Sequence, residues 1–82
     1  MRSFTLNKTY TVICESEDTR SGFRHVATLL KNGSEKASAK KSYLNRTWER
    51  FQFESVLLKL VNDNFEGEER QGFVNIIGEW NY

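Results

Sequence analysis

The chain contains no proline and only one cysteine, Cys14. A single cysteine excludes an internal disulfide, so packing must stabilise the fold, as is typical of proteins in a reducing compartment. No apolar run approaches the ~20 residues that a membrane-spanning helix needs. The first residues also lack the apolar segment of a secretion signal. These absences predict one cytoplasmic domain over residues 1–82, with no membrane segment.

Residue types with catalytic or metal-binding chemistry are scarce. One His and one Cys cannot form a structural zinc site of four ligands, and the acidic residues of 63–69 lack the spacing of a calcium loop. The five glycines are isolated, so no phosphate-binding loop is present. We therefore expect no metal, no cofactor and no enzymatic activity.

Cys14 and His25 are the only nucleophile–base candidate in the sequence. A first hairpin that closes near residues 15–22 would place Cys14 opposite Phe23 and His25 opposite Val12. The two would then be diagonal neighbours ~7–8 Å apart on the core face. A thiolate–imidazole pair needs direct contact, an orienting group and an oxyanion site. Because the last two are not evident in the sequence, we expect both residues to be core packing residues.

Alternating apolar residues predict strands in the first half of the chain. They lie at residues 4–6 and 10–14, with a bend near Lys8, then at 23–30 and at about 35–44. Residues 4–14 are thus read as the first strand, and the polar segment 16–22 is predicted to connect it to the second strand at 23–30.

Asn32-Gly33 marks a hairpin, and its loop length decides which side chains share a face. A two-residue turn would set Ala27 and Leu29 beside polar residues. A three-residue loop with Gly33 in the left-handed conformation keeps them on the face of Ala37 and Ala39. A one-residue slip would move the apolar set to the wrong face, so we predict the three-residue loop with a glycine bulge.

A helix is predicted to follow, capped by Asn45 or Thr47 and ending near residues 62–65. Its main apolar stripe is predicted to pack on the small residues of the strand at 35–44. A second stripe lies at i, i+7 and i+14 (Phe51, Leu58 and Phe65). Residues 66–72 are predicted to be a loop. The apolar tail 73–82 is predicted to be a fourth strand or a docked segment that covers the second stripe or a second subunit. The expected fold is therefore α+β: a three- or four-stranded antiparallel sheet (β-β-β-α, with an optional C-terminal strand) and one long helix on one face.

Basic residues are concentrated between residues 20 and 50, where eight Lys and Arg are opposed by two Glu. Because the whole chain has a net charge of only +1, the remainder is net acidic. Such segregation indicates a surface with an electrostatic preference. The even positions of the strands at 23–30 and 35–44 predict a basic sheet face with Arg24, Lys36 and Lys40. The candidate binding residues combine this face with the predicted strand–helix junction. They are Arg24, Lys36, Lys40, Lys41, Arg46, Trp48 and Arg50.

Trp48 lies off the main helix stripe, at the predicted first turn. A tryptophan there either fills the end of the core or is an exposed contact for a partner. Since tryptophan is highly buried on average, the core position is expected. Arg46 and Arg50 flank Trp48 and are predicted to stack on its ring.

The segment Tyr43-Leu44-Asn45-Arg46-Thr47-Trp48-Glu49-Arg50-Phe51, with the following Phe53-Glu54-Ser55-Val56, resembles a motif of short proteins from bacterial phages and mobile elements. Some of these proteins are anti-CRISPR or other anti-defence inhibitors. Others resemble the single-helix domain of the coactivator positive cofactor four, which binds single-stranded DNA as a dimer. The resemblance implies a protein of the host cytoplasm, but it transfers no catalytic residue.

Two functions follow as expectations. The first is an accessory protein that binds nucleic acid, such as single-stranded DNA, through the basic sheet face, with the second helix stripe forming a homodimer. The alternative is an inhibitor that binds a host nuclease or defence protein through Trp48 and the aromatic tail.

Overall fold

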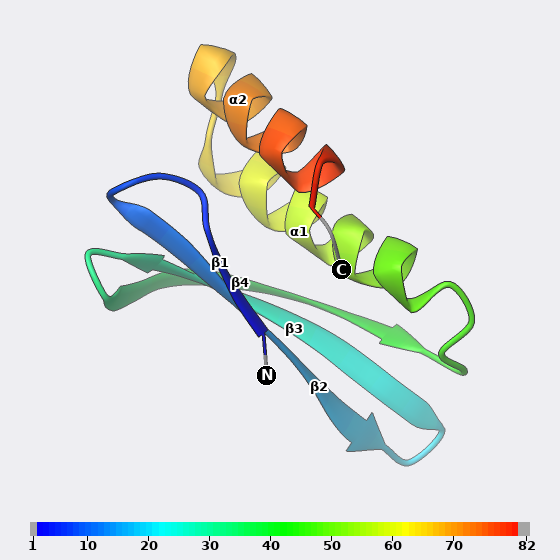
Figure 1. The fold of residues 1–82 in the computed structure, drawn as a ribbon. Coiled ribbons are helices and arrows are strands. Elements are labelled where there is room, and N and C mark those ends of the chain that lie inside the picture. The colour runs from blue at the N-terminus through cyan, green and yellow to red at the C-terminus, as the bar shows by residue number, and fades with distance from the viewer. Residues whose placement is uncertain (1, 81–82) are drawn as a thin grey trace.

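Four antiparallel strands and two helices build the protein (Figure 1). This computed structural model describes residues 2–80. The strands are β1 (Arg2–Thr5), β2 (Tyr10–Thr19), β3 (Gly22–Lys31) and β4 (Ser34–Tyr43), and they neighbour one another in chain order. The helices α1 (Glu49–Asn64) and α2 (Gly67–Gly78) lie on the same side of the sheet, with α1 against β3 and β4 (Figure 1). The predicted α+β class is confirmed.

The fourth strand comes from the N-terminal segment and not from the C-terminal tail. β1 pairs with β2, so the predicted bend near Lys8 is a complete reversal of the chain. Asn7 stabilises this reversal, because its side-chain oxygen accepts hydrogen bonds from the backbone N–H groups of Thr9 and Tyr10, both at 2.8 Å. Of the two alternatives for residues 73–82, the strand is wrong, because residues 73–78 belong to α2; residues 81–82 lie outside the described part.

The hairpin between β2 and β3 is longer than predicted. Thr19 pairs with Gly22, so only two residues form the turn, and the polar segment read as a connection continues β2. Its polar side chains have cross-strand partners: Ser16 lies opposite His25 and Glu17 opposite Arg24. The predicted pairing of Cys14 is consequently wrong, because Cys14 lies opposite Ala27.

In the hairpin between β3 and β4, the apolar side chains lie on the predicted face, but the loop differs from the prediction. Asn32 and Gly33 both have positive φ, 52° and 86°, and form a two-residue turn, as is common for Asn-Gly hairpins. Leu29 pairs with Ala37 while Leu30 pairs with Glu35, so Lys36 is an extra residue in β4. This bulge restores the parity that the turn would otherwise lose.

The core lies between the sheet and α1. The predicted main stripe of α1 is buried (Phe53, Val56, Leu57, Leu60 and Val61). Ala27 and Ala39 lie opposite each other and are buried, as expected where a helix passes close to a sheet.

α2 covers most of the second stripe of α1. Phe65 is buried with its ring centroid 4.7 Å from that of Phe73, and Leu58 packs against the core. Phe65 and Phe73 also contact Tyr10 edge to face, at 4.9 and 6.0 Å between centroids. We call Tyr10, Phe65 and Phe73 the closed aromatic cluster. The remaining stripe residue, Phe51, stays 53% exposed.

Candidate functional site: the junction between β4 and α1

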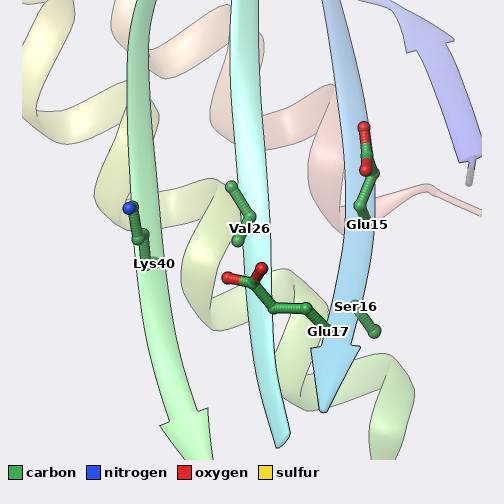
Figure 2. Close-up of a pocket in the computed structure, with 5 residues that line it drawn as sticks. All are labelled: Glu15, Ser16, Glu17, Val26 and Lys40. Atoms are coloured by element: carbon green, nitrogen blue, oxygen red, sulfur yellow. The ribbon is translucent and has the colours of Figure 1, made fainter. Parts of the chain in front are cut away.

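The outer face of the sheet, turned away from the helices, has both signs of charge. Arg24 and Lys40 lie on it, but β2 adds Glu15 and Glu17, which the sequence analysis did not place there. Figure 2 shows Glu15, Glu17, Val26 and Lys40 around one shallow depression. Arg24 Nε donates a hydrogen bond to Glu17 Oε1 at 2.7 Å. This face is therefore not the uniformly basic surface that β3 and β4 alone predict.

Two of the predicted binding lysines contact the helix side of the molecule. Because Lys36 is the bulge residue, its ammonium lies 5.3 Å from the ring centroid of Tyr10 and 5.5 Å from that of Phe65. Lys41 lies at an odd position of β4 and donates a hydrogen bond to Ser55 Oγ of α1 at 2.6 Å. Neither lysine joins Arg24 and Lys40 on the outer face.

Trp48 is displayed to solvent at the junction. Its side chain is 73% exposed, which corrects the expected core position. Its backbone is left-handed, with φ 61° and ψ 41°, a conformation that is unfavourable for bulky residues. The ring of Phe51 lies 5.9 Å away between centroids, so the two rings form one exposed pair.

The start of α1 also departs from the prediction. Trp48 occupies the N-cap position, and its side chain makes no capping hydrogen bond. Asn45 and Thr47, the predicted caps, hydrogen bond to each other, with Thr47 N–H donating to Asn45 Oδ1 at 3.0 Å. Leu44, the residue after β4, is 79% exposed. We call Leu44, Trp48 and Phe51 the exposed apolar set.

The two flanking arginines pack against other groups than the Trp48 ring. The guanidinium of Arg46 lies 4.4 Å from the ring centroid of Phe23 and 3.3 Å from Glu49. Arg50 donates hydrogen bonds to the carbonyls of Gly78 and Trp80, at 3.4 and 3.0 Å.

Arg50 also lies close to both an acid and an aromatic ring. Its guanidinium is 3.9 Å from the carboxylate of Glu54 and 5.5 Å from the centroid of Phe51. Arg50 therefore ties the start of α1 to the end of α2.

A polar chain centred on the buried His25 lies beneath the junction. His25 is 0% exposed, and its Nδ1 and Nε2 lie 2.7 Å from Ser16 Oγ and 2.8 Å from Gln52 Oε1. Gln52 Nε2 in turn donates to the carbonyls of Asn45 and Thr47 at 2.8 and 3.0 Å. Sequence reasoning missed this chain, because Gln52 lies off the apolar stripe and Ser16 was assigned to a loop.

Cys14 and His25 are both buried, as expected, but both imidazole nitrogens face other partners. Burial raises the pKa of the Cys14 thiol to about 12, with Arg2 opposing the shift. The thiolate needed by a nucleophile is thus disfavoured at neutral pH.

Within residues 2–80, His, Cys, Asp and Glu form no group of three that could hold a metal ion. No helix in that range is long and apolar enough to cross a membrane. Comparison of the chain with protein-family models, with curated proteins and with solved structures finds no match.

Proposed function

We propose that this chain is a non-enzymatic binding protein that docks on another protein through the exposed apolar set at the β4–α1 junction. The observation on which the proposal rests is Trp48, which is largely exposed and held in an unfavourable backbone conformation. Such strain persists only where surrounding structure enforces it, and it is concentrated at functional sites.

The composition of the junction supports a protein partner. Tryptophan, aromatic residues and arginine are enriched where a few residues supply most of the binding energy of an interface. Trp48 and Phe51 offer a paired aromatic surface, with Arg50 over the Phe51 ring. Such a surface fits an apolar pocket on the partner with polar groups at its rim.

The local charges favour protein over nucleic acid. Three arginines near the junction have an acidic neighbour: Glu17 lies beside Arg24, Glu49 beside Arg46 and Glu54 beside Arg50. Neutralised arginines give a weak field for a polyanion, whereas nucleic-acid binding depends mainly on unopposed positive charge.

The experiment is a capture from bacterial lysate on immobilised protein, with nuclease treatment, followed by a direct binding measurement with the purified captured protein. Bacterial lysate is chosen because residues 43–51 resemble a motif of phage proteins. We expect Trp48→Ala to lower affinity about 30-fold or more, as for a hot-spot residue worth ~2 kcal/mol, without unfolding the protein.

Lys8→Ala is the matched control, because Lys8 is exposed at the opposite end of the sheet. Equal binding by the Trp48→Ala and Lys8→Ala variants would contradict the proposed docking surface. Capture that disappears on nuclease treatment would point instead to nucleic acid.

Nucleic-acid binding is the second candidate, and one depression supports it. Arg20 and Arg24 line this depression at the β2–β3 turn together with the hydroxyl residues Thr19, Ser21 and Ser42. Guanidinium and hydroxyl groups are typical phosphate contacts, and the Trp48 ring could stack on a base.

Titration with single-stranded DNA at two salt concentrations tests this candidate. We expect the logarithm of the binding constant to fall linearly with the logarithm of the salt concentration, with a slope of ~0.7 for each phosphate contact. A flat salt dependence, or no binding at low salt, would exclude it.

A further inference from the structure

The Gln52 side chain contacts the loop before Trp48 at two points. Its amide nitrogen donates one hydrogen bond to the carbonyl of Asn45 and another to that of Thr47. Both amide hydrogens are thereby used, since a primary amide has two donors. The amide oxygen is left to accept, and it faces Nε2 of His25 at 2.8 Å.

This orientation decides which atom of His25 must bear a hydrogen. Because Gln52 Oε1 can only accept, Nε2 must bear one. Nδ1 faces the hydroxyl of Ser16 at 2.7 Å. Both ring nitrogens of the buried His25 therefore have a hydrogen-bond partner, as a buried polar group requires.

Packing prevents the imidazole from turning. His25 is fully buried, with the rings of Phe53 and Phe23 at 4.0 and 5.0 Å between centroids. A fixed imidazole fixes the Gln52 amide, and the amide fixes two successive parts of the loop.

The backbone of Gln52 adds a third point of attachment. Its N–H donates to the carbonyl of Trp48 at 3.1 Å. The loop is thus held immediately before and at the residue with positive φ. A left-handed conformation is unfavourable for a non-glycine residue, and the three hydrogen bonds from Gln52 offset this cost.

We infer that Ser16, His25 and Gln52 are positioning residues that hold Trp48 in its exposed conformation. This inference rests on the proposed docking function of Trp48. A contact residue that is ordered before binding loses less conformational entropy on association. Trp48 is therefore displayed by a polar chain that reaches from β2 through the buried His25 of β3 to α1.

The first test needs no partner. In Gln52→Leu, backbone amides of residues 45–49 should exchange hydrogen about tenfold faster, because two hydrogen bonds are lost. Exchange in the centres of β2 and β3 should change little. Gln71→Leu is the matched control, since Gln71 is exposed on α2 and hydrogen bonds to Asn75 of the same helix. Unchanged exchange at residues 45–49 in Gln52→Leu would overturn the positioning role.

The second test measures binding of the captured partner, purified as above. Gln52→Leu should bind it about tenfold more weakly although Trp48 is intact. A loosened loop with unchanged affinity would overturn the claim that positioning serves binding. Full binding by Trp48→Ala would instead overturn the docking function itself, so the two failures are distinguishable.

Ser16→Ala serves if Gln52→Leu does not fold. It removes only the hydrogen bond to Nδ1, from an exposed residue. Loop exchange should then rise about threefold, in the same direction as for Gln52→Leu. No increase would overturn the part of the inference that includes Ser16.

Discussion

Two groups of aromatic residues lie at opposite ends of the sheet and have opposite fates. The closed aromatic cluster of Tyr10, Phe65 and Phe73 is buried where α2 begins, whereas Trp48 and Phe51 are exposed where α1 begins. Both groups have a cation near a ring, Lys36 in the first and Arg50 in the second. Residue chemistry therefore does not distinguish core from contact surface here. The distinction depends on whether another element lies over the rings.

The backbone differs between the two ends in the same sense. Phe65, the residue after α1, has extended φ and ψ of −134° and 159°, which any residue adopts easily. Trp48, the residue before α1, is left-handed. The closed cluster is thus stabilised by packing, while the exposed pair is held at the expense of local strain.

The largest effect is expected in the closed aromatic cluster. Phe73→Ala should lower the free energy of unfolding by about 3–5 kcal/mol, because it leaves a cavity between Phe65 and Tyr10. Phe51→Ala, the matched change in the exposed pair, should lower the free energy of unfolding by less than about 1 kcal/mol. Urea denaturation followed by circular dichroism measures both. Equal losses would mean that the open pair is as much a part of the core as the closed one.

Cys14 reports whether the helix-covered face stays closed. Its pKa is raised from 9.0 to about 12, so at pH 8 the thiolate should be about a thousandfold less populated than in the unfolded chain. Alkylation by iodoacetamide at pH 8 should be correspondingly slow and should accelerate in urea. Fast alkylation of the folded protein would show that this face opens.

The same shift affects stability at alkaline pH. Because the folded-state pKa is the higher one, the stabilising contribution is complete below about pH 9 and is lost as the pH rises toward 12. Cys14→Ala should flatten this part of the stability profile.

At Trp48, one substitution should raise the stability of the protein and at the same time abolish partner binding. Trp48→Gly should raise the free energy of unfolding by about 1 kcal/mol, because glycine adopts positive φ without strain and is a better N-cap than tryptophan. The same substitution should abolish partner binding. Lower stability of the Trp48→Gly variant would show that the ring contributes packing that exceeds the relief of strain.

The smallest effect is expected for the cation of the closed cluster. Lys36→Met retains most of the aliphatic stem but removes the charge above Tyr10 and Phe65, and should destabilise the protein by about 0.5–1 kcal/mol. Lys40→Met, at an exposed position on the outer face of β4, is the control. A loss in both variants would assign the effect to general surface charge.

Periodicity predicted much of the fold correctly. The parity of β3 and β4 placed Ala27 and Leu29 on the face of Ala37 and Ala39, and the main stripe of α1 is buried as expected. These predictions succeed because burying one face constrains every second or every third to fourth residue. The predicted length of the loop between β3 and β4 was wrong, because a bulge at Lys36 has the same effect on side-chain parity as a longer loop.

The helical form of the C-terminal segment was not predicted, because its local signals conflict. Gly67, Gly72 and Gly78 lie in or at the ends of α2, and glycine disfavours helix. Packing of Phe73 and Ile77 against the rest of the core overrides this preference.

The sequence by itself determined the α+β class, the buried face of β3, the packing stripe of α1 and the candidate residues of the junction. Local periodicity is sufficient for these, because each depends on residues close together in the chain. Only the tertiary structure decided that Glu15 and Glu17 join Arg24 and Lys40 on one face, and that Trp48 is exposed. These outcomes depend on register between strands and on the hydrogen bond between His25 and Gln52, 27 residues further along the chain. Contacts between such distant positions leave no periodic signal in the sequence.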